Sequence, residues 1–222
     1  MEKILAEGLV VGDSNSPAEE IVTRSSNVAD PQNYIILPGK THESYSYSDM
    51  LVAMDRTHYG KNWNESHAAL AQEDSYMINI RQFVDFLNLL KSGKAFDGKG
   101  KQVDKGKLDS ILDEIWTVRS PWRSEWLDAK FKLKGRNMLG LGKEMHINYD
   151  HRMVNGQPLP TYTGKLTNYL KIDKTPGISM DEWLANVKKH GLPQEDIGQG
   201  DLYYWHPRDG KVAGFDADWN GA

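Results

Sequence analysis

Apolar residues recur at helical spacing in the middle of the chain. One segment begins after Asn79, whose side chain can cap a helix, and ends at Gly93; its apolar face consists of Ile80, Phe83, Val84, Leu87 and Leu90. A later segment has an apolar face of Leu108, Ile111, Leu112 and Ile115. Side chains three and four positions apart share one side of a helix, so both patterns predict amphipathic helices that pack on a core.

Two shorter helices are predicted before these. Ser48 is placed to cap a helix that runs to a stop near Gly60, and Asn64 is placed to cap a second helix over residues 65–72. With the two longer helices, they make residues 48–116 a helical half of the protein.

The beginning of the chain has a different character. Residues 1–47 are mostly polar and are interrupted by Asn, Ser, Asp and Pro, which indicates an irregular segment. Its best strand candidate is the apolar run at 34–37. We therefore divide the chain into an N-terminal irregular segment, residues 1–47, and a domain, residues 48–222.

Beyond residue 122, alternation of apolar and polar residues replaces the helical spacing and predicts strands. These strands are placed at residues 126–133, 145–149, 202–206 and 212–218. Asn155-Gly156 predicts a tight turn. One helix interrupts the strands: Ser179 and Glu182 have the spacing of a capping box, and Gly191 ends it. The expected class is α+β.

Composition narrows the possible functions. The chain has 222 residues, with 27 Lys and Arg against 31 Asp and Glu, and the resulting net charge of −4 disfavours nucleic acid as a partner. The lysines between positions 91 and 107 lie among glycines and polar residues, and we interpret them as a solvated loop. The chain has no Cys, which excludes disulfides and thiolate metal sites.

The hydropathy of the chain also bears on its location. No stretch approaches the roughly 18–20 apolar residues that a bilayer-spanning helix needs. Residues 1–13 are too acidic, and their apolar run is too short, for a signal peptide. We expect a soluble protein without a signal peptide or a membrane span.

Common catalytic motifs are missing from the sequence. It contains no phosphate-binding Gly-rich loop with Lys-Ser/Thr, no Gly-x-Ser-x-Gly and no His-Glu-x-x-His. His58, Glu65 and His67 surround a predicted turn and could form a metal site or an acid–base pair. Their spacing matches no common ligand pattern, and polar residues beside turns usually bond backbone groups. We therefore predict no metal and no cofactor, and keep an enzyme that uses these three residues as an alternative.

Two other polar clusters are open to a functional interpretation. His146 lies in the predicted strand 145–149 and His151 follows it, and their separation of five residues would place them on opposite faces. The segment Trp122–Asp128 could stack a ligand between Trp122 and Trp126, or could join the helical half to the sheet with both rings in the core. The second interpretation is favoured because this segment connects the two halves.

The last predicted strand has two unlike faces. Ala213, Phe215 and Ala217 alternate with Gly214, Asp216 and Asp218, so one face would be packed and the other would carry short polar groups. An ordinary edge strand would have the same pattern.

The C-terminal sequence resembles a known family. Residues 203–217, Tyr-Tyr-Trp-His-Pro-Arg-Asp-Gly-Lys-Val-Ala-Gly-Phe-Asp-Ala, are similar to the start of the variable region in target proteins of diversity-generating retroelements of the archaeal and archaeal-virus kind. That region reads Trp-x-Pro-Arg and then Val-Ala-x-Phe-x-Ala, with the x positions mutated. Residues 57–63 and 121–131 also resemble such proteins, so the resemblance spans residues 48–222.

The resemblance implies a C-type lectin-like fold of the formylglycine-generating-enzyme subtype, with a helical first half. It implies a binding protein rather than an enzyme, located in the cytoplasm or on a virion. Its ligand is unknown but is expected to be a protein, and a monomer is favoured. The ligand-binding residues would be Gly214, Asp216, Asp218, Trp219, Asn220 and Gly221. A viral structural component is the other alternative.

The mutagenesis of that family offers a check on these positions. Changes at template adenines can convert an Asn codon to Asp, Gly, Ser, Tyr or His but not to Trp, so Trp219 departs from the pattern. The family also continues beyond the position of Ala222 with further variable residues. We therefore expect this chain to be a trimmed or shortened relative.

Overall fold

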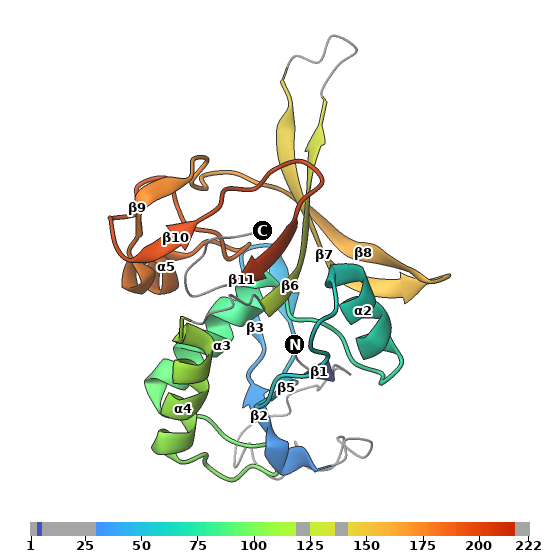
Figure 1. Cartoon of the computed structure of the whole chain (residues 1–222), viewed down its shortest axis with the longest axis vertical. Coiled ribbons are helices and arrows are strands. Elements are labelled where there is room, and N and C mark those ends of the chain that lie inside the picture. Colours follow the sequence, from blue (N-terminus) through green and yellow to red (C-terminus); the bar gives the residue numbers. More distant parts are fainter. Residues whose placement is uncertain (1–3, 6–29, 119–124, 136–141, 216–222) are drawn as a thin grey trace.

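The computed structural model describes residues 4–5, 30–118, 125–135 and 142–215, and shows a mixed α+β protein with small antiparallel sheets (Figure 1). Its largest sheet has four antiparallel strands in the order β11-β6-β7-β8. These strands are Val212–Phe215, Glu125–Lys134, Glu144–Val154 and Gln157–Lys165. The predicted α+β class is confirmed at this level.

A second sheet lies at the N-terminal end of the described chain. It has the order β1-β5-β2, with β1 at Ile4–Leu5, β5 at Met50–Ala53 and β2 at Tyr34–Leu37. The prediction of a strand at 34–37 is confirmed, and the prediction of a helix capped by Ser48 is wrong. All four residues of β5 are buried, and a short run that is apolar on both sides is typical of a strand enclosed between two others.

Four α-helices lie in the described residues: α2 (Trp63–Ala71), α3 (Ile80–Ser92), α4 (Lys105–Trp116) and α5 (Met180–Asn186). Helices α3 and α4 confirm the predictions from their apolar spacing. Asn79 and Gln82 form a reciprocal capping box at the start of α3, and Gly93 ends it in the left-handed conformation. Helix α2 is capped by Asn62 rather than Asn64, because Glu65 then completes a capping box. None of these helices is long and apolar enough to cross a membrane.

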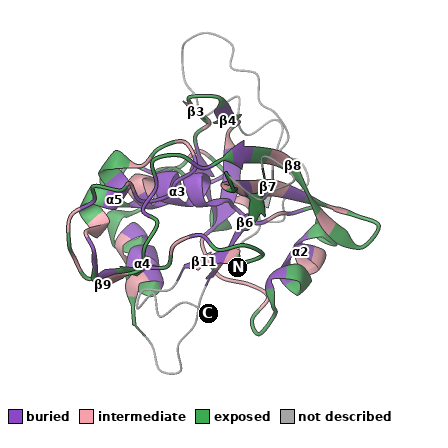
Figure 2. Ribbon diagram, turned by 90° about the horizontal axis from the view of Figure 1, so that it is seen from above, coloured by how far each residue is buried: buried purple, intermediate pink, exposed green. Residues whose placement is uncertain are grey.

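Helix α3 is the centre of the core. Figure 2 shows it buried along almost its whole length. Phe83 of α3 meets Phe215 of β11 with ring centroids 5.1 Å apart, and Phe215 also contacts Trp116 of α4 and Trp183 of α5. One aromatic side chain of β11 therefore joins the large sheet to three helices.

A short hairpin, β3 (Lys40–His42) and β4 (Tyr45–Tyr47), packs on α3, and a carboxylate of α3 contacts both of its strands. Asp85 is buried and accepts hydrogen bonds from Arg81 Nη2 at 2.8 Å and Tyr47 Oη at 2.7 Å. It also pairs with His42 Nε2 at 2.7 Å and Lys40 Nζ at 3.2 Å. Burial alone raises the pKa of Asp85, but the Tyr47 hydrogen bond and the two nearby cations outweigh it and hold the pKa below its usual value.

The connection from β7 to β8 is the tight turn predicted at Asn155-Gly156. Both residues have positive φ, 51° and 77°, as a two-residue turn of this kind requires. The following strand β8 contains Pro158 and Pro160, opposite Met153 and His151 of β7. Proline disfavours a strand prediction, and β8 tolerates both prolines because it lies at the edge of the sheet.

A small sheet and α5 complete the described structure. Strand β9 (Lys174–Ile178) pairs with β10 (Leu202–Tyr204). Helix α5 begins at the predicted cap, Ser179, but ends at Asn186 and does not extend to Gly191. Gly191 instead lies against α3, where an added Cβ would stand 2.7 Å from the backbone nitrogen of Arg81, and its φ of 83° also favours glycine.

Candidate functional site

Strand β11 carries the only predicted ligand-binding position that falls within the described residues, Gly214. Ala213 and Phe215 are buried, 7% and 1% exposed, whereas Val212 and Gly214 are half-buried. The predicted inward orientation of Ala213 and Phe215 is confirmed. The other predicted ligand-binding positions lie outside the described residues: Asp216, Asp218, Trp219, Asn220 and Gly221. Ala217, which was predicted to face the core, also lies outside them.

A hollow of about 130 Å³ lies beside β11, and its walls come from β6, β10, β11 and α5. Aromatic side chains dominate it, among them Trp126, Trp183 and Tyr203. Among the described residues that line it, Arg208 and Lys211 are cationic and none is Asp or Glu. A mainly apolar hollow with a few charged groups has the character of a ligand site.

The loop between β10 and β11 borders this hollow and is held by Asp173. The Asp173 carboxylate accepts hydrogen bonds from the backbone nitrogen of His206 at 3.0 Å, from His206 Nδ1 at 2.9 Å and from Arg208. Although partial burial raises the pKa of Asp173, the His206 hydrogen bonds lower it further and leave it below its usual value. Arg208 also lies 5.5 Å from the Trp205 ring centroid. These contacts position Tyr203 and Trp205, each 38% exposed, near the hollow.

Gly214 can accept a side chain with little change in stability. A Cβ added there would stand 3.3 Å from Trp126 Cε3, a side-chain atom that can shift by a few tenths of an ångström. We expect Gly214→Ser to change the free energy of unfolding by less than about 1 kcal/mol, as surface substitutions usually do. The matched control is Gly177→Ser in β9, where the added Cβ would overlap the carbonyl of Leu202 and overpacking would destabilise by about 1–3 kcal/mol. Chemical denaturation measures both, and equal losses would contradict a tolerant face at residue 214.

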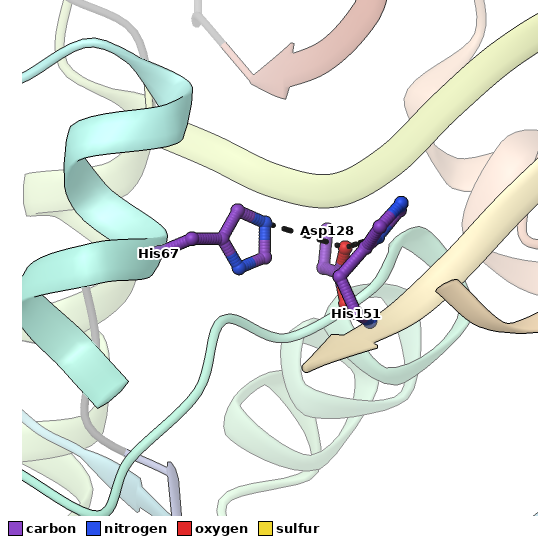
Figure 3. Close-up of side chains that lie close together, drawn as sticks. All are labelled: His67, Asp128 and His151. Carbon is purple, nitrogen blue, oxygen red and sulfur yellow. Dashed lines mark hydrogen bonds and ion pairs between the residues drawn. The ribbon is translucent and has the colours of Figure 1, made fainter. Parts of the chain in front are cut away.

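A second group of polar residues lies in the interior, between α2 and the large sheet. His67 of α2, Asp128 of β6 and His151 of β7 are 3%, 0% and 2% exposed. Figure 3 shows His67 reaching from its helix toward the Asp128 carboxylate, with His151 on the other side. Each residue offers a ligand atom, and these atoms all lie within 4.8 Å of one another. The three residues form the His–Asp–His cluster.

Asp128 is the centre of this cluster. His151 bonds Asp128 twice, through ring Nδ1 to Oδ1 and through its backbone nitrogen to Oδ2 at 2.8 Å. His67 Nε2 lies 3.5 Å from Oδ1. Burial by itself raises the pKa of Asp128, but the hydrogen bond with His151 and the interaction with His67 outweigh it, so the pKa lies below its ordinary value. Asp128 is therefore ionised at neutral pH although it is fully buried.

Trp63 encloses the cluster from the α2 side. Its ring lies edge to face with His67 at 4.2 Å between centroids and with His151 at 5.1 Å. Its indole nitrogen donates to the carbonyl of Leu127 at 3.0 Å, which fixes α2 against β6. Because this ring packs against both imidazoles, the cluster is part of the joint between helix and sheet.

The structure does not bring the predicted group His58, Glu65 and His67 together. His58 Nε2 lies 3.4 Å from Glu73, and Glu65 is used in the α2 capping box with Asn62. Only His67 of the three reaches the His–Asp–His cluster. The spacing argument gave no reason to expect a site at this group, and it could not identify the partners that His67 has from distant strands.

His146 and His151 lie on different faces of β7, as predicted. His151 is buried in the cluster, whereas His146 is half-buried and lies 3.9 Å from Glu144. Trp122, for which a core position was favoured over ligand stacking, lies outside the described residues. Trp126 borders the hollow beside β11 and donates its indole hydrogen to the carbonyl of Lys61 at 3.0 Å.

One further histidine makes the stability depend on pH. His190 is 7% exposed and its Nδ1 lies 3.2 Å from Tyr149 Oη. Burial and the charge of Lys189 lower the pKa of His190 from 6.5 to about 4. The unfolded chain therefore takes up a proton near pH 6.5 that the folded chain does not accept until near pH 4, so stability is lost as the pH falls through this window.

Between pH 7.5 and pH 5, we expect the free energy of unfolding to fall by about 2 kcal/mol less in His190→Gln than in the wild type. Asp150 acts in the opposite direction, because burial raises its pKa to about 6, but its effect is common to both proteins. Urea denaturation of wild type and variant at the two pH values measures the difference. Parallel pH dependences would show that His190 is not the source.

Comparison with protein-family models, with curated proteins and with solved structures gives no match to this chain.

Proposed function

We propose that this chain is a non-catalytic ligand-binding protein of the diversity-generating retroelement type, which presents variable side chains from a C-type lectin-like scaffold. One observation carries the proposal. In β11, buried Ala213 and Phe215 alternate with half-buried Gly214 next to an aromatic hollow. The face of Ala213 and Phe215, which packs on the core, is therefore opposite to the face of Gly214, which the proposal takes to vary.

The packing of β11 supports this division of roles. Phe215 is held by rings from α3, α4 and α5, and Gly214 backs onto the Trp126 ring. A substitution at residue 214 would add a side chain without removing any of these contacts. A backbone fixed in this way loses little conformational entropy when a ligand binds, which favours affinity.

The surroundings of the hollow fit a protein ligand. Tyr203 and Trp205 offer partly exposed aromatic surface, and Arg208 and Lys211 offer positive charge. Aromatic residues and arginine are enriched among the residues that dominate binding energy at protein interfaces. Trp219, predicted as an anchor of the same surface, lies outside the described residues.

The burial of the His–Asp–His cluster supports binding over catalysis. Its three side chains are at most 3% exposed, and Trp63 packs against both rings. A general acid or base must come within hydrogen-bonding distance of a substrate atom. This position in the interior favours a structural role for the cluster.

A selection experiment tests the proposal. A library varied at Gly214, Asp216, Asp218, Asn220 and Gly221 is displayed and selected against several unrelated proteins, and the selected variants are melted to check their folding. A matched library on the exposed edge strand β8, varied at Gln157, Leu159, Thr161, Thr163 and Lys165, is the control. We expect specific binders from the first library at a much higher frequency than from the second. Well-folded libraries that produce binders equally, or none, would overturn the proposal.

The neighbouring DNA provides an independent test. The proposal requires a template repeat that matches the codons of the C-terminal region except at adenines, close to a reverse transcriptase gene. Sequencing of the genomic locus settles this without any assay of binding.

A further inference from the structure

We propose that His67, Asp128 and His151 form a structural binding site for a divalent transition-metal ion, with zinc as the expected occupant. The site joins α2 to β6 and β7 from inside the protein. It is separate from the hollow beside β11, and it stands whether or not the proposed ligand-binding function is correct.

The first support is the convergence of three suitable donors from distant parts of the chain. Two imidazoles and one carboxylate, with ligand atoms within 4.8 Å of one another, are of the kinds that zinc takes in proteins. Nitrogen donors favour zinc and its transition-metal neighbours over magnesium and calcium, which prefer oxygen. The sequence suggested no metal because it has no Cys and its histidines have no recognised ligand spacing, and neither reason applies to ligands brought together by the fold.

The second support is a buried nitrogen whose contact with Asp128 is too long and poorly aligned to count as a hydrogen bond. Among the residues that the structure describes, none forms a hydrogen bond with His67 Nε2, although the side chain is 3% exposed and points at Asp128, whose Oδ1 lies 3.5 Å away. A buried polar atom that is left without a hydrogen bond destabilises a protein. A metal ion between His67 and Asp128 would satisfy this nitrogen.

The distances support the same arrangement. Two ligand atoms at 2.0–2.1 Å from a tetrahedral zinc lie roughly 3.3 Å apart. His67 Nε2 and Asp128 Oδ1 are 3.5 Å apart, so an ion fits between them with little movement. His151 Nδ1 is instead hydrogen-bonded to Asp128 Oδ1, with the proton on the imidazole nitrogen. When His151 joins the metal, that proton leaves to solvent and a small shift of the ring opens the space for the ion.

The burial of the cluster defines its role. Catalytic zinc keeps a position open to substrate, whereas these ligands are 0–3% exposed. An internal water would supply the fourth ligand. The ion would stabilise the joint between helix and sheet that Trp63 already closes, and it would also offset the negative charge of the buried Asp128.

The experiment uses the full chain without an affinity tag. The protein is stripped with a chelator and then titrated with Zn²⁺ and, separately, with Co²⁺, whose visible spectrum reports tetrahedral nitrogen and oxygen ligands. Mg²⁺ is the negative control. We expect one equivalent of Zn²⁺ or Co²⁺ per chain, a tetrahedral Co²⁺ spectrum that Zn²⁺ abolishes, and a melting temperature raised by Zn²⁺ but not by Mg²⁺.

Two variants place the ion in the cluster. His67→Gln removes a ring nitrogen that makes no hydrogen bond, so the protein should fold, and loss of a direct ligand should weaken Zn²⁺ binding by at least about 100-fold, beyond the effect of a lost supporting contact. His206→Gln is the control, since its ring bonds Asp173 and takes no part in the cluster. Folded wild type that binds neither ion, or His67→Gln that binds as wild type does, overturns the proposal and leaves the cluster a metal-free hydrogen-bonded network.

Discussion

Phe215→Ala is expected to lower the free energy of unfolding by about 3–5 kcal/mol, the usual range for a large aromatic side chain removed from a core. The ring is 1% exposed and contacts Phe83, Trp116 and Trp183. No small rearrangement can fill the space that it leaves, because its neighbours belong to three different helices. Chemical denaturation followed by tryptophan fluorescence and circular dichroism measures the loss.

A matched apolar truncation serves as the control. Leu159→Ala, at a residue 49% exposed on β8, should change stability by less than about 0.5–1 kcal/mol, because little buried surface is lost. Similar losses from Leu159→Ala and Phe215→Ala would show that β11 is not anchored through its buried face. The assignment of a packed face and a variable face to β11, on which the proposed binding function rests, would then be wrong.

Asp85→Ala is expected to destabilise the protein by about 3–5 kcal/mol, as removal of one partner from a buried ion pair does. The substitution leaves Arg81, whose side chain is 5% exposed, without its carboxylate and releases Tyr47, His42 and Lys40 together. The β3–β4 hairpin should then detach from α3 before the rest unfolds. Hydrogen exchange of the amides in residues 40–47 shows this directly.

Tyr47→Phe tests how much of the effect comes from the Tyr47 hydrogen bond and how much from the charge of Asp85. It deletes one 2.7 Å hydrogen bond to a charged group and keeps Asp85 and its cations, so about 1.5–3 kcal/mol should be lost. If Asp85→Ala destabilised no more than Tyr47→Phe, the carboxylate would contribute through that single bond and the network interpretation would fail.

Local rules account for much of the fold. Helices α3 and α4 follow from apolar spacing and from their caps, and the Asn155-Gly156 turn follows from the need for positive φ. These features depend on residues close together in the chain. The misassigned helix at Ser48 is different, because the four apolar residues of β5 become a strand only when β1 and β2 enclose them. That partnership is set by tertiary contacts and leaves no periodic pattern in the sequence.

The candidate sites differ in the same way. The inward orientation of Ala213 and Phe215 follows from alternation along one strand. The His–Asp–His cluster could not be found by spacing, since its members are separated by 61 and 23 positions, at 67, 128 and 151. One clue was present: Asp128 stands between Leu127 and Ala129, and an acid within an apolar stretch needs a partner in the interior.

The edge strand β8 has a consequence for self-association. In a hairpin closed by a two-residue turn, the pair Val154–Gln157 exchanges hydrogen bonds, so the positions of Pro158 and Pro160 face away from β7. Both sites lack the backbone hydrogen that an incoming strand would need, and side-by-side stacking of two molecules through β8 is discouraged for the length of that stretch. The two prolines therefore disfavour fibrous aggregation through β8. Without them, the exposed side chain of Leu159 would favour it.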